Sequence, residues 1–92
     1  MRVEWSQNAV ADLQQISEYI EQDRSLETAN RISRRLYDAV QSLRTFPDRG
    51  RLGHVDDTRE LVVPSLPYII VYQVFEKRVL ILNIVHGAQR WP

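Results

Sequence analysis

The side chains with the most chemical potential in this 92-residue sequence lie in its second half. They combine guanidinium groups, which hold phosphate and stabilise negative charge, with a histidine that can move a proton near neutral pH. Metal-free cleavage of RNA requires this combination. The set consists of Arg49, Arg51, Arg59, His86 and Arg90, with Tyr68 and Tyr72 between them in the sequence.

The expected order of strands would bring part of this set together. If residues 59–63, 68–74 and 78–85 are consecutive antiparallel strands, the last strand ends beside the start of the middle one. We therefore expect His86 and Arg90 to approach Arg59 or the loop at 49–51. A purely structural interpretation stays open, in which the arginines contact solvent, the tyrosines pack in the core and His86 bonds a backbone carbonyl.

Other chemistries lack their usual sequence signals. There is no glycine-rich phosphate loop, no helical pair of histidines with a carboxylate and no serine in an elbow motif. His54 and His86 are too few for a metal site, and the absence of cysteine excludes thiolate zinc sites, catalytic thiols and disulfides. We expect neither a metal nor a cofactor.

Charge is unevenly distributed although the formal net charge is zero. Residues 1–30 hold two arginines and six acids, whereas residues 31–59 hold seven arginines and four acids. Arginine favours planar, bidentate contact with phosphate or carboxylate. Arg31, Arg34 and Arg35 form either a solvated face or a partner-binding face, and Trp91 either closes the core or anchors a partner.

Two helices are expected in the first half, after a short strand at residues 2–5. Ser6 is suited to cap a helix over residues 7–22, where apolar residues recur every three or four positions. Ser25 is suited to cap a second helix over residues 26–45 with a similar stripe. The short connection makes the helices antiparallel neighbours.

The second half changes to a strand pattern. Pro47, Gly50 and Gly53 mark a loop, and residues 59–63, 68–74 and 78–85 follow as strands. Residues 68–74 are apolar on both faces and belong in the middle of a sheet, with Pro64 and Pro67 in the preceding turn. We predict a single α+β domain over residues 1–92, ordered β-α-α-β-β-β, with a helical hairpin on a mainly antiparallel four-stranded sheet.

Composition agrees with one globular domain. The hydrophobic fraction of 43% and the charged fraction of 26% are close to the averages for soluble proteins. No apolar run approaches the length of a membrane span, and the N-terminal residues lack the apolar core of a secretory signal. We expect a cytoplasmic protein without a membrane partner.

The segments TRELVVPSLPYIIVYQV and RVLILNIVHGAQRWP, with the opening VEWSQNAVADLQQISEYI and the FPDRGR turn, resemble toxins of the RelE/ParE superfamily. The likeness covers nearly the whole chain. It implies the RelE/ParE toxin fold and the toxin half of a bacterial type II toxin–antitoxin pair, which arrests growth when free. It also implies a small antitoxin that wraps its C-terminal segment around the toxin, and operator DNA bound only through that antitoxin.

The superfamily divides by target. RelE-like members cut mRNA on the ribosome with Lys and Arg residues and a C-terminal aromatic residue or histidine, whereas ParE-like members poison DNA gyrase. Here Ala88 or Gln89 stands where a further catalytic arginine is expected, and the long helical hairpin is more similar to the ParE branch. The resemblance therefore favours gyrase. A metal-independent mRNA endonuclease using Arg49, Arg51, Arg59, His86 and Arg90, or a non-toxic module binding an acidic partner, stays open.

Overall fold

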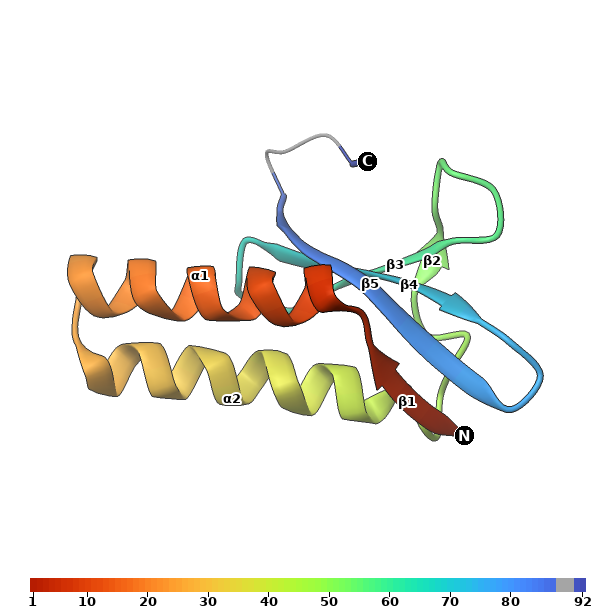
Figure 1. The fold of residues 1–92 in the computed structure, drawn as a ribbon, viewed down its shortest axis with the longest axis horizontal. Coiled ribbons are helices and arrows are strands. Elements are labelled where there is room, and N and C mark those ends of the chain that lie inside the picture. Colours follow the sequence, from red (N-terminus) through yellow and green to blue (C-terminus); the bar gives the residue numbers. More distant parts are fainter. Residues whose placement is uncertain (88–90) are drawn as a thin grey trace.

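Two helices and five strands make up the computed structural model, which describes residues 1–87 and 91–92 (Figure 1). The two helices lie side by side as a hairpin beside the sheet. In chain order the elements are β1 (Arg2–Trp5), α1 (Gln7–Asp23), α2 (Leu26–Ser42), β2 (Arg51–Leu52), β3 (Arg59–Val62), β4 (Tyr68–Val74) and β5 (Arg78–His86).

Both helices begin at the predicted serine caps. The Ser6 hydroxyl accepts a hydrogen bond from the Ala9 amide at 3.0 Å, and the Ser25 hydroxyl accepts one from the Thr28 amide at 3.1 Å. The second helix ends at Ser42, earlier than the predicted residue 45, because residues 43–45 form turns. These caps fix where each helix starts.

The sheet has the order β1-β5-β4-β3-β2, so the apolar strand β4 is central, as predicted. The β1–β5 pair is parallel and the other pairs are antiparallel. The prediction of four strands was one short, because Arg51 and Leu52 pair with Glu60 and Arg59 as β2. Two residues are too few to show the alternation by which strands are recognised. The α+β class and the mainly antiparallel sheet are confirmed.

A β-bulge in β5 keeps its apolar residues on the core side. Val71 pairs with Asn83 and Tyr72 pairs with Ile81, so Leu82 is an extra residue in β5. This shift lets Ile81 and Ile84 both join the buried cluster, which on β4 includes Tyr72. Without the bulge, strict alternation would turn one of the two isoleucines away from the helices.

Helix α1 and its cap bond the part of β5 that extends beyond the last residue paired with β1, Ile81. The Ser6 hydroxyl donates to the Leu82 carbonyl at 2.8 Å. The Asp12 carboxylate accepts from the Ile84 amide and from the Asn83 side chain, both at 2.9 Å. These bonds place the N-terminal half of α1 on β5.

An ion pair joins the parallel edge strand to the rest of the sheet. Arg78 donates to Glu4 at 2.6 Å, and this hydrogen bond holds the pKa of the Glu4 carboxyl below its usual value.

Among the described residues, neither helix has the length and apolar character required to cross a membrane.

Candidate functional site

Tyr72 of β4 holds the loop between α2 and β2. We call residues 47–51 of this loop, which include Arg49 and Arg51, the basic loop. Its ring is fully buried, and its hydroxyl accepts from the Gly50 amide and donates to the Pro47 carbonyl, both at 2.8 Å. Burial is the main cause that raises the pKa of this hydroxyl. Tyr72 therefore stays protonated and acts as an anchor for the loop.

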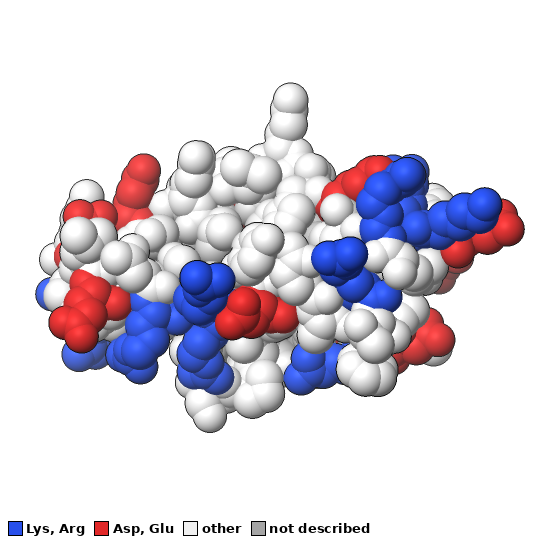
Figure 2. Space-filling model, turned by 90° about the horizontal axis from the view of Figure 1, so that it is seen from below, with Lys and Arg blue, Asp and Glu red and all other residues white. Residues whose placement is uncertain are grey.

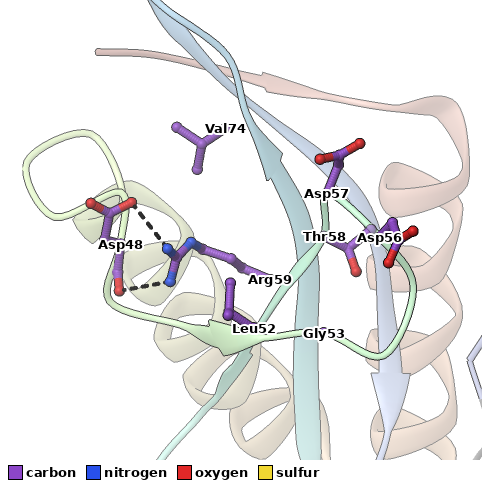
Figure 3. A pocket seen from close by; sticks show the side chains of 8 residues that line it. All are labelled: Asp48, Leu52, Gly53, Asp56, Asp57, Thr58, Arg59 and Val74. Carbon is purple, nitrogen blue, oxygen red and sulfur yellow. Dashed lines mark hydrogen bonds and ion pairs between the residues drawn. The ribbon is translucent and has the colours of Figure 1, made fainter.

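Arg59 of β3, which pairs with Tyr72 and shares its face of the sheet, reaches the same loop. It donates to the Gly50 carbonyl at 2.8 Å and to the Asp48 carbonyl at 3.4 Å, and it lies 3.6 Å from the Asp48 carboxylate. Figure 3 shows it pointing towards Asp48 across a hollow of about 400 Å³. Asp56 and Asp57 line the opposite side of this hollow, so its lining holds three carboxylates and one guanidinium and is unsuited to phosphate.

The other two loop arginines also contact the chain itself. Arg49 donates to the Ser42 hydroxyl at 2.8 Å, and Arg51 donates to Glu60 at 3.0 Å. Arg51 and Glu60 are opposite each other in the β2–β3 pair, so their side chains share one face of the sheet. Because Tyr72 faces the helices and strand residues alternate, the neighbouring Val71, opposite Glu60, faces away from them.

His86 lies at the far end of the sheet from Arg59. It pairs with Tyr68, whereas Arg59 pairs with Tyr72, four residues or about 13 Å along β4. The prediction that His86 approaches Arg59 was therefore wrong. In an antiparallel meander, the start of β3 lies beside the end of β4, and the end of β5 lies beside the start of β4. Arg90, also predicted there, lies outside the described residues.

His86 instead lines a second hollow, of about 430 Å³, between α1 and the sheet. Its ring contacts the Tyr68 ring edge-on at a centroid distance of 5.9 Å. Burial, and then the nearby Tyr19, raises the pKa of Tyr68. The hollow joins His86 and Tyr68 to Asp12 and Tyr19 of α1, a combination that the sequence did not predict because it depends on helix placement.

Trp91 lies over the face of the sheet that points away from the helices. The Trp91 indole donates to Asn83 at 2.9 Å, and the Trp91 carbonyl accepts from His54 at 2.6 Å. Asn83 is paired with Val71, which has no exposed surface. These Trp91 contacts lie outside the buried cluster, so both predicted roles of Trp91, closing the core and anchoring a partner, stay predictions.

His54 connects this chain end to the basic loop. Its Nδ1 atom lies 3.2 Å from Glu60 Oε2, close enough for an ion pair with a protonated ring, but this oxygen accepts no hydrogen bond within the described part of the chain. Glu60 is buried beneath His54 and Arg51. Sequence reasoning considered His54 only as a metal ligand and missed this contact.

The three arginines of the predicted basic face of α2 lie in different surroundings. Arg35 donates to the Pro64 carbonyl in the β3–β4 turn, whereas Arg34 lines a hollow between α1 and α2. Arg31 is exposed. Figure 2, seen from the side of α2, shows Lys and Arg side chains interspersed with Asp and Glu.

No group of three or more His, Asp or Glu side chains in residues 1–87 and 91–92 could hold a metal ion.

Comparison with known proteins gives consistent relatives. Residues 3–91 match the family model described as the ParE toxin of the type II toxin–antitoxin system parDE. Toxin RelE2 of Caulobacter vibrioides is 43% identical over 88 residues, which cover 96% of this chain and 97% of that protein. The protein described as "Putative toxin Y4kP" of Sinorhizobium fredii is 40% identical over 91 residues, covering 99% of this chain and 93% of the relative.

A solved structure agrees with these sequence relatives. A chain of the chromosomal ParDE toxin–antitoxin system from P. aeruginosa superposes with a TM-score of 0.86 and 25% sequence identity. The match covers 94% of this chain and 95% of that one. The likeness therefore extends over the helical hairpin and the sheet together.

Proposed function

Because the chain belongs to the ParE toxin family of type II toxin–antitoxin systems, we propose that it arrests bacterial growth by poisoning DNA gyrase and that a cognate antitoxin silences it. It acts in this proposal as a protein ligand of its target. No bond of a nucleic acid is broken by its own side chains.

The separation of His86 from Arg59 is the observation that carries this choice of target. General acid–base cleavage needs the proton-transferring group and the phosphate-binding cations within hydrogen-bonding reach of one substrate. Here the pairing register puts about 13 Å of strand between His86 and Arg59. Arg51 and Arg59 also each lie beside a carboxylate of the chain, Glu60 and Asp48, which competes with phosphate for the guanidinium charge.

The test combines purified protein with gyrase and supercoiled DNA, and measures cleaved DNA after protein denaturation. We expect cleaved complexes to accumulate as the toxin concentration rises and to disappear when the antitoxin is added first. Gyrase carrying a mutation of its catalytic tyrosine is the matched control, because it cannot form a cleaved complex. Unchanged DNA at saturating toxin would exclude gyrase as the target.

Ribosome-dependent mRNA cleavage is the second candidate, favoured by the name of the 43% identical relative, RelE2. It predicts new RNA 5′ ends at a fixed place within codons, minutes after the protein is induced alone. It also predicts that His86→Ala and Arg59→Ala each remove toxicity from a folded protein. Growth arrest without such ends favours gyrase, and unimpaired growth favours a non-toxic binding module.

A further inference from the structure

His54 lies between two groups that can only accept hydrogen bonds. Its Nε2 atom is 2.6 Å from the Trp91 carbonyl oxygen, and its Nδ1 atom is 3.2 Å from Glu60 Oε2. A carbonyl oxygen and an ionised carboxylate have no hydrogen to donate, so favourable contact on each side requires a proton from the ring. We call these contacts, from Glu60 through His54 to Trp91, the His54 bridge.

A neutral histidine ring cannot make both contacts favourable, because it carries one N–H group and one bare nitrogen. If the N–H group is at Nε2, it donates to Trp91, and the lone pair of Nδ1 faces the Glu60 carboxylate. If it is at Nδ1, it faces Glu60, and the lone pair of Nε2 faces the Trp91 carbonyl. Each tautomer therefore leaves one repulsive contact, whereas the protonated ring has an N–H group for both neighbours.

Glu60 has little access to water, which would otherwise solvate its charge. Its side chain is 6% exposed, and its Oε2 atom accepts no hydrogen bond within the described part of the chain. The other carboxylate oxygen, Oε1, accepts from Arg51 at 3.0 Å. A buried carboxylate oxygen that lacks a donor is costly, so a positive charge on the neighbouring ring stabilises it.

The loop that carries His54 is closed by its own hydrogen bonds. The Gly53 amide donates to the Thr58 carbonyl at 2.8 Å, and the Thr58 hydroxyl donates to the Val55 carbonyl at 2.5 Å. A Cβ atom at Gly53 would lie 2.3 Å from Thr58 Oγ1, so glycine is required there. Because these bonds do not involve Trp91, weakening of the Nε2 contact would free Trp91 and leave His54 beside Glu60.

Other charged groups near the ring oppose one another. Arg51 bonds the same carboxylate and disfavours a second cation, whereas Asp56 and Asp57, on the same loop as His54, favour one. Among residues 1–87 and 91–92, Glu60 is the acid within ion-pair distance of the ring. The His54 side chain is 64% exposed, so water weakens this ion pair without removing it.

We propose that the His54 bridge is a proton-dependent contact that holds Trp91 against the face of the sheet away from the helices. The protonated ring attracts Glu60 and donates to Trp91 at the same time. Histidine gains and loses its proton between about pH 5 and 8. As the pH rises and the ring becomes neutral, one contact turns repulsive, and Trp91 keeps only its bond to Asn83. Trp91 is then released more often, and the surface around Asn83 becomes more accessible.

This proposal goes beyond the proposed toxin function and is independent of the target. The experiment follows the indole groups of the two tryptophans by NMR of the intact, 15N-labelled protein between about pH 5.5 and 8.5. Trp91→Phe identifies the Trp91 signal. Trp5, which stacks on Tyr37, is the internal control.

We expect the Trp91 signal to move with rising pH towards its position in the unfolded protein. The ratio of held to released Trp91 should fall about three- to tenfold, the effect of losing one hydrogen bond. The Trp5 signal should stay in place. A Trp91 signal that does not change over this range would overturn the proposal.

Two variants test the role of the proton. His54→Gln can donate to Trp91 but cannot gain a charge, so the pH response should disappear. Glu60→Gln replaces the carboxylate by an amide, whose NH₂ group can donate to Nδ1 while its oxygen still accepts from Arg51. A neutral ring then satisfies both neighbours, and Trp91 should stay held up to about pH 8.5. A pH response that persists in His54→Gln, or release of Trp91 at high pH in Glu60→Gln, contradicts the bridge.

His86→Gln is the matched control, because it removes the other histidine of the chain. Its pH response should equal that of the parent protein. If His86→Gln removes the response instead, the assignment to His54 is wrong. Circular dichroism checks the folding of every variant, and either bridge variant decides the question if the other does not fold. Since growth arrest is not measured, failure of the proposed toxin function would leave this result unchanged.

Discussion

Single polar atoms determine the shape of the basic loop. Tyr72 and Arg59 both hold residues 47–50, one through a phenol and the other through a guanidinium. Gly50 is required at this contact because a Cβ atom there would lie 2.7 Å from the Tyr72 hydroxyl. The sequence analysis placed Tyr72 and Arg59 in a possible RNA-cleaving set, whereas in the structure both side chains support the loop.

Tyr72→Phe tests this support. We expect the free energy of unfolding at pH 7 to fall by about 2 kcal/mol, because two hydrogen bonds are lost and the buried Gly50 amide loses its acceptor. Urea unfolding measures the change. Tyr19→Phe, at an exposed position, is the control and should change stability little. Equal stability of Tyr72→Phe and the parent protein would contradict the anchoring role.

The same variant has a defined pH dependence. Since burial raises the pKa of Tyr72 above the unfolded value of 10.0, the neutral hydroxyl stabilises the folded state fully below that pH, and this stability is lost as the pH rises through the folded pKa. The difference between the parent protein and Tyr72→Phe should therefore shrink above pH 10. The raised pKa of Tyr68 leaves part of the alkaline loss in both proteins.

At the scale of elements, the junction between α1 and the bulge in β5 is the feature that local sequence patterns do not reveal. Ser6 was predicted as a helix cap, and it is one, but its hydroxyl also donates to the Leu82 carbonyl. Ser25 also caps its helix, α2, but its hydroxyl donates to Thr28 within that helix instead of to the sheet. The two serines therefore provide a matched comparison.

We expect Ser25→Ala to lower the free energy of unfolding by about 1 kcal/mol, the usual cost of losing a cap. Ser6→Ala should cost about 1 kcal/mol more, because the Leu82 carbonyl in the bulge also loses its donor. Parallel urea titrations of the two variants measure the difference. If both substitutions cost the same, the bond from α1 to the bulge contributes nothing to stability.

At the scale of the whole molecule, Trp91 lies over the second face of the sheet. The helices bury one face, and Trp91 is held over the other by Asn83 and His54. Val71 and Glu60, on that face, are buried although no helix lies there. Trp91 thus joins the last strand to the loop that follows β2, and it contacts His54 although the two residues are 37 positions apart.

Trp91→Ala should lower the free energy of unfolding by about 2 kcal/mol, as expected for removing a partly buried aromatic ring. The free energy of unfolding of Trp91→Phe should lie between those of Trp91→Ala and the parent protein, since phenylalanine keeps a ring but loses the bond to Asn83. A chain truncated after Gly87 should keep a nearly native circular dichroism spectrum but unfold at lower urea concentration. Full stability of the truncated chain together with lost toxicity would favour a partner-binding role of the chain end.

Local sequence alone determined the elements and the class of fold. The caps at Ser6 and Ser25, the helical stripes and the apolar strand at Tyr68–Val74 are each specified by neighbouring residues, so their limits were predicted within a few positions. Resemblance of the same segments to known toxins gave the family, which the comparison confirmed. The target and the site residues stay predictions.

Tertiary structure decided which residues meet. The two-residue strand β2, the bulge at Leu82 and the return of Trp91 to His54 depend on contacts between residues far apart in sequence, which periodicity does not encode. Strand register then separated His86 from Arg59, although both lie on strands of one antiparallel meander. A strand pattern specifies which face a side chain occupies, but only the paired sheet specifies its distance from a side chain on another strand.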